Sequence, residues 1–170
     1  MGYEGLASKM YFREYFDDLG WSGRYPRTKI DYLNSILDIG YTILFAYIEA
    51  LLSIYGFDLY CGVMHTGFYM RKSLVCDIME PFRVIIDKQM KKSVHLKQFQ
   101  EEDFFCENER YVLQWKNSPK YVKVFLEAIF EHKDEIFLYV RQYYRAFMKS
   151  SSLEQFPTWT IGGNDDHFEL

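Results

Sequence analysis

The chain has 170 residues, enough for one domain with a sizeable core. Its apolar fraction of 49% and charged fraction of 26% are typical of a folded globular protein and argue against extensive disorder. Residues 1–100 carry 12 Lys and Arg against 11 Asp and Glu, whereas residues 101–170 carry 8 against 13. The net charge of −4 excludes a uniformly basic nucleic-acid-binding coat but leaves room for a local basic patch.

The first part of the chain predicts a helix over residues 2–19, with Gly20 as its stop. Its expected apolar side consists of Leu6, Met10, Tyr11, Phe12 and Phe16. A loop containing Gly23 and Pro26 follows it.

A long helix is expected next, capped by Thr28, with Ile30 on its apolar side, and running to about Tyr55. Residues 39–57 are nearly long enough to span a bilayer. Glu49 lies within this stretch and acidic residues precede it, so we expect a buried central helix and no membrane.

The second half alternates between connectors and helices. Ser73 is the expected cap of a helix that runs toward Met90, with a kink or restart at Pro81. Residues 104–115 allow a short strand or hairpin, and two helices are expected over 119–131 and 133–148. The sequence therefore predicts a single, mostly helical, all-α domain over residues 1–149 and a polar C-terminal tail over 150–170.

Three acidic residues and one histidine are candidates for metal chemistry. Asp77 and Glu80 are three residues apart and project from one helix face, His65 precedes them in a glycine-flanked loop, and Glu4 lies near the start of the first helix. Carboxylate and imidazole donors can hold Mg²⁺ or Mn²⁺. Spacing alone leaves the ordinary alternatives open, a solvated helix face and a structural histidine.

Basic residues surround these positions in the sequence. They are Arg24 and Arg27 beside Pro26, Arg71 and Lys72 before the Asp77 helix, Arg83 three residues after Glu80, and then Lys88, Lys91 and Lys92. Positive charge beside a carboxylate metal site suits a phosphate-bearing substrate. The alternative is a set of ordinary helix-end charges and ion pairs.

Four ordered segments together resemble the integrase family of CRISPR adaptation, specifically its helical catalytic domain. They are GYEGLASKMYF at 2–12, RTKIDYLNSIL at 27–37, GVMH at 62–65 and SLVCDIMEPFR at 73–83. The resemblance covers about residues 2–148. It places the metal ligands at Glu4, His65 and Glu80, an additional acid beside them at Asp77, and an active-site asparagine at Asn34.

The resemblance implies a DNA-joining reaction that needs Mg²⁺ or Mn²⁺ and takes place in the prokaryotic cytoplasm. A 3′-hydroxyl of a short duplex, the prespacer, attacks a phosphodiester at the border of a CRISPR repeat. Arg24, Arg27, Arg71, Lys72 and Lys91 are the candidate contacts to double-stranded DNA. Joining two strands requires two active sites, so a homo-oligomer, dimer or tetramer, is expected.

One departure from the family concerns the N-terminal β-rich domain that usually precedes this one and pairs two copies. Its absence before Glu4 suggests a cut fragment or a naturally short integrase. It leaves open whether the small ferredoxin-like adaptation partner takes part.

Three other functions remain open from the residues. The same ligands could serve a metal-dependent endonuclease that uses water as nucleophile. The chain could be a non-catalytic fragment. A structural zinc site could use Cys61 and His65 with Cys76 or Cys106, although the expected state of these cysteines is reduced and mostly buried.

Overall fold

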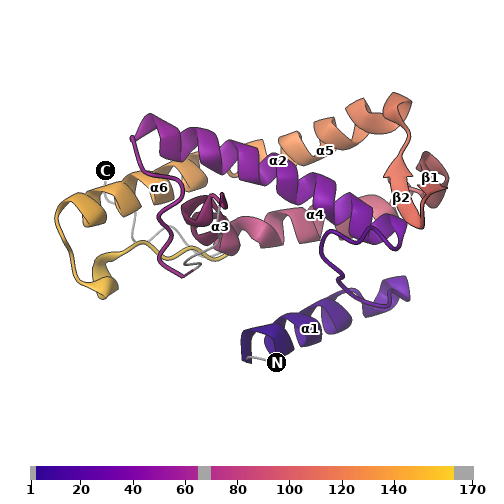
Figure 1. Cartoon of the computed structure of the whole chain (residues 1–170), viewed down its shortest axis with the longest axis horizontal. Helices are drawn as coiled ribbons and strands as arrows, with labels where there is room; N and C mark the ends of the chain where they lie inside the picture. Colours follow the sequence, from indigo (N-terminus) through magenta and orange to yellow (C-terminus); the bar gives the residue numbers. More distant parts are fainter. Residues whose placement is uncertain (1–2, 65–69, 163–170) are drawn as a thin grey trace.

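The computed structural model describes residues 3–64 and 70–162, apart from the side chain of Glu4. The helices are α1 (Tyr3–Tyr15), α2 (Tyr32–Ile54), α3 (Ser73–Met79), α4 (Arg83–His95), α5 (Ser118–Glu131) and α6 (Lys133–Met148). One antiparallel hairpin, β1 (Phe104–Glu107) with β2 (Arg110–Leu113), and short 3₁₀ turns complete the described chain (Figure 1). The prediction of a mostly helical domain with at most one hairpin is confirmed.

Helix α2 is the central element of the core. It contacts α3, α4 and α5, and it crosses the length of the bundle (Figure 1). Gly40 lets α2 pack close to α4, because a Cβ atom at this position would lie 2.4 Å from Cγ2 of Ile86. Among the described residues α2 alone is long and apolar enough to cross a membrane, yet half of its most apolar window is buried inside the protein. This burial agrees with the predicted core helix.

The start of α2 corrects one prediction. Thr28 does not cap it, because Arg27 and Lys29 on either side adopt left-handed backbone with φ of 65° and 53°. Asp31 is the cap, and its side chain accepts a hydrogen bond from the backbone N–H of Asn34 at 2.6 Å. Ile30, placed on the apolar side of the helix by its periodicity, is exposed.

Pro81 interrupts the next helix as predicted. A 3₁₀ turn, Glu80–Phe82, separates α3 from α4, since proline cannot donate the backbone hydrogen bond that a continuous helix needs. Ser73, predicted as a cap, is the first helical residue of α3, and Lys72 occupies the cap position without a side-chain hydrogen bond to the first turn.

The hairpin joins β1 to β2 through Asn108 and Glu109. Both residues have positive φ, 50° and 61°, which matches the two-residue turn that strand twist favours. Phe104 pairs with Leu113 and Glu107 with Arg110, and Phe104 is the buried residue of the hairpin.

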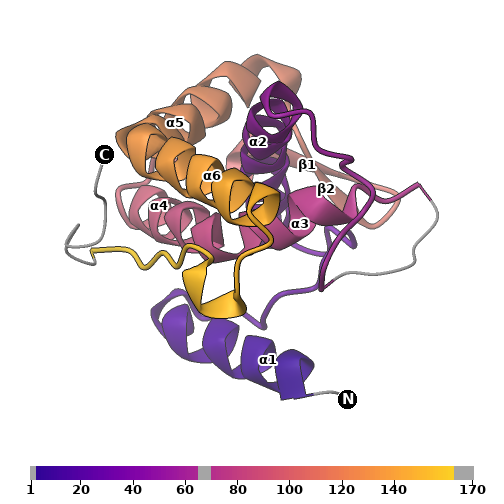
Figure 2. The same cartoon turned by 90° about the vertical axis from the view of Figure 1, so that its left-hand side faces the viewer.

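Helix α1 lies at the edge of the bundle (Figure 2). It ends at Tyr15, four residues before the predicted end, and a 3₁₀ turn, Asp17–Leu19, leads to Gly20. Phe12 and Phe16 are buried, but Leu6 and Met10, predicted on the same apolar side, are 51% and 57% exposed. Only the C-terminal part of the apolar side of α1 is therefore buried in this fold.

The described part of the tail packs on its own chain. Nε1 of Trp159 donates to Oε2 of Glu135 on α6 at 2.6 Å, and the Trp159 ring lies 4.8 Å from that of Phe82. The division at residue 149 into a catalytic domain and a tail stays a prediction.

Candidate functional site

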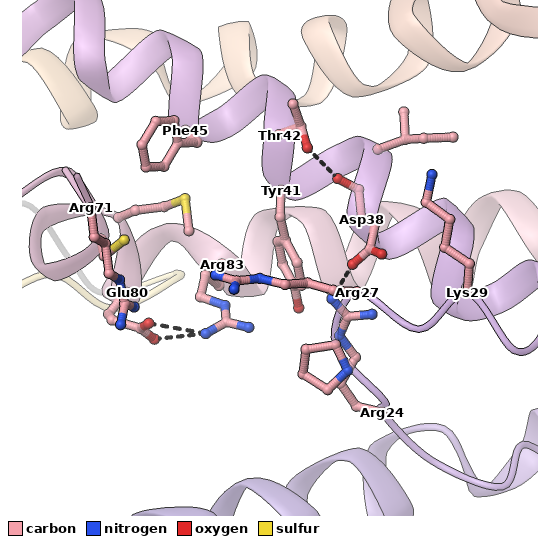
Figure 3. A pocket seen from close by; sticks show the side chains of 14 residues that line it. Arg24, Arg27, Lys29, Asp38, Tyr41, Thr42, Phe45, Arg71, Glu80 and Arg83 are labelled. Carbon is pink, nitrogen blue, oxygen red and sulfur yellow. Dashed lines mark hydrogen bonds and ion pairs between the residues drawn. The ribbon is translucent and has the colours of Figure 1, made fainter. Parts of the chain in front are cut away.

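A basic cleft opens between the loop before α2, the exposed side of α2 and the segment from Arg71 to Arg83 (Figure 3). Its volume is about 710 Å³. The charged side chains that line it are Arg24, Arg27, Lys29, Arg71 and Arg83, with Asp38 and Glu80 as the acids. Five cations against two carboxylates make this region strongly positive in a chain whose net charge is −4.

Glu80 lies in this cleft and is paired with Arg83. Nη1 of Arg83 donates to both carboxylate oxygens, at 3.0 Å and 3.1 Å, and the guanidinium carbon lies 4.5 Å from the ring centre of Tyr41. Burial lowers the pKa of Arg83, but its neighbours Tyr41 and Glu80 outweigh burial and raise the pKa overall. The pair holds the Glu80 carboxylate at the cleft wall, where it is about one-third exposed.

Asp77 fixes the loop that leads toward His65. Its Oδ2 accepts the backbone N–H of Val63 at 2.6 Å and of Met64 at 3.0 Å. The first described stretch therefore ends at Met64, which is hydrogen-bonded to Asp77, three residues before Glu80. His65 and the side chain of Glu4 lie outside the described residues.

The predicted metal ligands are therefore described only at Glu80. Within residues 3–64 and 70–162, no three His, Cys, Asp or Glu side chains gather closely enough to hold a metal ion. The assignment of Glu4, His65 and Glu80 as one ligand set stays a prediction.

Asn34 is fully buried and fastens the preceding loop to α2. Its Oδ1 accepts the backbone N–H of Tyr25 at 2.7 Å and Nη1 of Arg24 at 3.1 Å, and its Nδ2 donates to the carbonyl of Gly23 at 3.1 Å. Nη2 of Arg24 forms an ion pair with Asp38 at 2.5 Å. Asn34 thus shapes one wall of the cleft rather than facing into it.

The five predicted DNA-contacting cations divide into two groups. Arg24, Arg27 and Arg71 all line the cleft, but Arg27 and Arg71 form no ion pair within the described part of the chain. Nε of Arg71 is buried without a hydrogen-bond partner there. By contrast, Arg24 pairs with Asp38, Lys72 with Glu49, and Lys91 with Asp18 at 2.9 Å. The hydrogen bond to Glu49 raises the pKa of Lys72.

Two further cleft cations, Lys29 and Arg83, are not among the DNA contacts predicted from the sequence. Lys29 has no ion pair among the described residues, and its carbonyl accepts the backbone N–H of Tyr111 at 2.9 Å, which ties the loop to β2. Its spacing of three residues from Glu80 singles out Arg83 in the sequence, because residues three apart on a helical turn are neighbours, and the structure confirms that the two are paired. Lys29 gives no such signal in the sequence.

The cysteines differ from expectation. Cys61 and Cys106 are exposed and Cys76 is half-buried against the cleft, so the prediction of mostly buried thiols is wrong. The zinc alternative depends on His65, which lies outside the described residues.

The family described as CRISPR associated protein Cas1 has a model that matches residues 1–127, more than half of the chain. The chain belongs to the Cas1 family. This confirms the resemblance from which the site residues are predicted.

Two curated Cas1 relatives show how much of the family's length is present. The chain is 30% identical over 145 residues to CRISPR-associated endonuclease Cas1 1 of Archaeoglobus fulgidus, which covers 79% of this chain and 41% of the relative. It is 36% identical over 89 residues to CRISPR-associated endonuclease Cas1 3 of Thermus thermophilus, covering 50% and 27%. The chain thus spans less than half the length of these Cas1 relatives.

Two solved structures share the fold. A casposase bound to its integration product superimposes with a TM-score of 0.80 at 21% identity, covering 96% of this chain and 52% of that one. A partial Cas6–RT–Cas1–Cas2 complex gives a TM-score of 0.80 at 24% identity, covering 92% and 52%. The helical arrangement is therefore that of the Cas1 and casposase structures.

Proposed function

We propose that this chain is the helical, DNA-joining part of a Cas1-family integrase, which inserts short foreign DNA at CRISPR repeats. The observation that carries the proposal is the position of Glu80 in a cleft whose other charged residues are mainly cations. A phosphodiester backbone is the polyanion that such a surface suits.

The donors at the site fit Mg²⁺ or Mn²⁺. Glu80 presents a carboxylate to the cleft, and in this proposal Glu4 and His65, the positions given by the family motif, would supply a second carboxylate and an imidazole. A bound divalent ion would polarise the target phosphate and stabilise the charge that develops on it. Asp77 would act beside the metal by holding the loop that leads to His65.

The proposed reaction is a transesterification. The 3′-hydroxyl oxygen of the incoming duplex forms a bond to the target phosphorus, and the P–O3′ bond of the target breaks. The attacking hydroxyl loses a proton, and the departing 3′ oxygen gains one. Arg27, Lys29 and Arg71 would hold the target phosphates, because their charges are unpaired within the described chain. They would position the backbone without reading bases.

The names of related proteins support DNA and protein partners. One fold relative is a casposase bound to an integration product, and another is a complex of Cas1 with Cas2. We propose that this chain binds prespacer and repeat DNA in the prokaryotic cytoplasm and acts as a dimer or tetramer. The small ferredoxin-like adaptation partner would join such dimers.

The second candidate is hydrolytic cleavage. Several relatives are named endonucleases, and the same site with water in place of the 3′-hydroxyl would cut DNA. The two reactions differ in whether the attacking oxygen belongs to DNA.

The deciding experiment incubates the chain with Mn²⁺ or Mg²⁺, a labelled duplex with free 3′-hydroxyls and a plasmid carrying a CRISPR array. A parallel reaction adds the small partner protein. Glu80→Ala removes the site carboxylate, and Glu127→Ala, an exposed glutamate on α5, is the matched control.

Label joined to plasmid in either reaction, lost with EDTA and with Glu80→Ala but kept by Glu127→Ala, would support the integrase. Cut DNA without joined label would support the endonuclease. Unchanged DNA in both reactions would contradict both functions.

A further inference from the structure

Three residues on one face of α4 hold the N-terminal segment. Asp87, Lys91 and His95 follow one another at intervals of four, so they form a single stripe along the helix. Each makes a polar contact with the segment between Tyr11 and Asp18. We call these three residues the docking stripe.

Asp87 is the buried end of the stripe, only 3% exposed. Its Oδ2 accepts the hydroxyl of Tyr11 on α1 at 3.0 Å, and its Oδ1 accepts the hydroxyl of Tyr41 on α2. Burial raises the pKa of this carboxyl, although the two tyrosine hydrogen bonds oppose the shift. A buried carboxylate with two donors from different helices fixes those helices relative to each other.

Lys91 and His95 bind the other end of the segment. Nζ of Lys91 donates to the carbonyl of Tyr15 at 2.6 Å and pairs with Asp18 at 2.9 Å. Nε2 of His95 lies 2.8 Å from the second oxygen of Asp18. The last turn of α1 and the 3₁₀ turn after it are thus tied to α4 at two points.

Apolar burial alone holds α1 weakly. Among its described side chains only Phe12 is buried, with Phe16 directly after the helix, while Tyr3 is 95% exposed and Leu6 and Met10 are more than half exposed. The position of the first turns of α1 therefore depends on the polar contacts that follow them.

The same stripe reaches the Glu80 side of the site. The Tyr41 ring that Asp87 orients lies beneath the guanidinium of Arg83, at 4.5 Å, and Arg83 binds Glu80. Asp87 thus binds Tyr11, on the helix that carries Glu4, and Tyr41, which lies against Arg83.

We propose that the docking stripe positions α1, and with it Glu4, relative to Glu80. Asp87, Lys91 and His95 are positioning residues that act through α1 and touch no substrate. This assigns Lys91 to α1 docking in place of DNA contact. The inference rests on the proposed function, because it takes Glu4 and Glu80 as ligands of one metal ion.

The test measures two properties of the whole chain, hydrogen exchange of the α1 amides and Mn²⁺ affinity by calorimetry. The variants are Asp87→Asn and, because that buried change can impair folding, the more exposed double change Lys91→Ala with His95→Ala. Lys92→Ala, an exposed lysine on the same helix, is the matched control. We expect faster exchange in α1 and Mn²⁺ affinity weaker by about tenfold, as for other residues that orient metal ligands. Exchange in α2 should stay unchanged in the Lys91 and His95 double variant, because it leaves the bond between Asp87 and Tyr41 in place.

A double-mutant cycle separates docking from other effects. If the stripe acts through Glu4, adding the Lys91 and His95 changes to Glu4→Gln will not weaken Mn²⁺ binding further. Faster α1 exchange with unchanged Mn²⁺ affinity would overturn the positioning role, and so would unchanged α1 exchange. A wild-type chain that binds no Mn²⁺ would instead overturn the proposed metal site, and the positioning role with it.

Discussion

Both carboxylate oxygens of Glu80 lie within hydrogen-bonding distance of a single nitrogen, Nη1 of Arg83, at 3.0 Å and 3.1 Å. Arg83 thus occupies the carboxylate that a metal ion would need. It is itself held over the ring of Tyr41. If Glu80 binds a metal ion as proposed, Arg83 and that ion would compete for the same carboxylate.

Replacing Arg83 by methionine should tighten Mn²⁺ binding about fivefold, since a partly exposed ion pair contributes at most about 1 kcal/mol. The same change should weaken DNA binding, because it removes a cation from the cleft. Calorimetry with Mn²⁺ and anisotropy with labelled duplex measure the two effects. Arg145→Met, at an exposed arginine of α6, is the control. Weaker Mn²⁺ binding by Arg83→Met would show that Arg83 assists the site and does not compete for Glu80.

Arg71→Ala and Arg27→Ala should each weaken DNA binding and reduce the salt dependence of the affinity, by about 0.9 in the log–log slope for each phosphate that the variant no longer neutralises. Lys72→Ala and Lys91→Ala should change the slope little, because Glu49 and Asp18 already pair with these lysines. Fluorescence anisotropy over a series of salt concentrations gives all four slopes. Equal slopes for the two arginine and the two lysine variants would remove the cleft from the DNA surface.

Asn34→Ala should destabilise the fold by about 1–3 kcal/mol, because the backbone N–H of Tyr25 and the carbonyl of Gly23 lose a partner. Urea unfolding measures this loss. The control on the same helix is Ser53→Ala, whose exposed hydroxyl donates to the Glu49 carbonyl. A stability equal to that of the Ser53 variant would mean that Asn34 does not hold the loop.

Asp87→Asn should alter the pH dependence of stability in a defined direction. Burial raises the folded-state pKa of Asp87 despite the hydrogen bonds from Tyr41 and Tyr11, so the folded state holds this proton more tightly than the unfolded state. The contribution of Asp87 to stability therefore falls as pH rises from the unfolded pKa, about 4, through the raised folded pKa. Asparagine has no such charge, so the stability of the variant relative to wild type should improve over that window.

Urea unfolding of both proteins between about pH 4 and pH 8 tests this sign. Asp58→Asn, at an exposed aspartate, is the control substitution. A relative stability of Asp87→Asn that declines with rising pH would refute the burial argument.

The elements predicted most accurately have local causes. The apolar periodicity of residues 119–148 places α5 and α6 within one residue of their observed starts, and Pro81 marks the break between α3 and α4. The predicted start of α2 is wrong because Thr28 and Asp31 both suit a helix cap. The left-handed backbone of Lys29, bound through its carbonyl to Tyr111, decides between them, and these two residues lie far apart in the sequence.

The charged residues that line the cleft could be singled out from the sequence by type, but their pairings could not, and their roles stay a prediction. Glu80, Arg27 and Arg71, each named from the sequence as a candidate, line one cleft. The partner of Lys91 is Asp18, in a segment far away in sequence, and that of Lys72 is Glu49 on α2. Such tertiary ion pairs leave no trace in local spacing. Lys72, which is paired, and Arg71, which has no ion pair within the part of the chain that the structure describes, therefore look alike in the sequence.

The most direct test of the proposed function compares strand joining by the wild-type chain and Glu80→Ala, with Mn²⁺ and with the small partner protein both present and absent. We predict joined product from the wild type that disappears with Glu80→Ala, while DNA affinity is retained because the basic cleft remains. Joined product at the wild-type level from Glu80→Ala would contradict the assignment of the cleft as the catalytic centre.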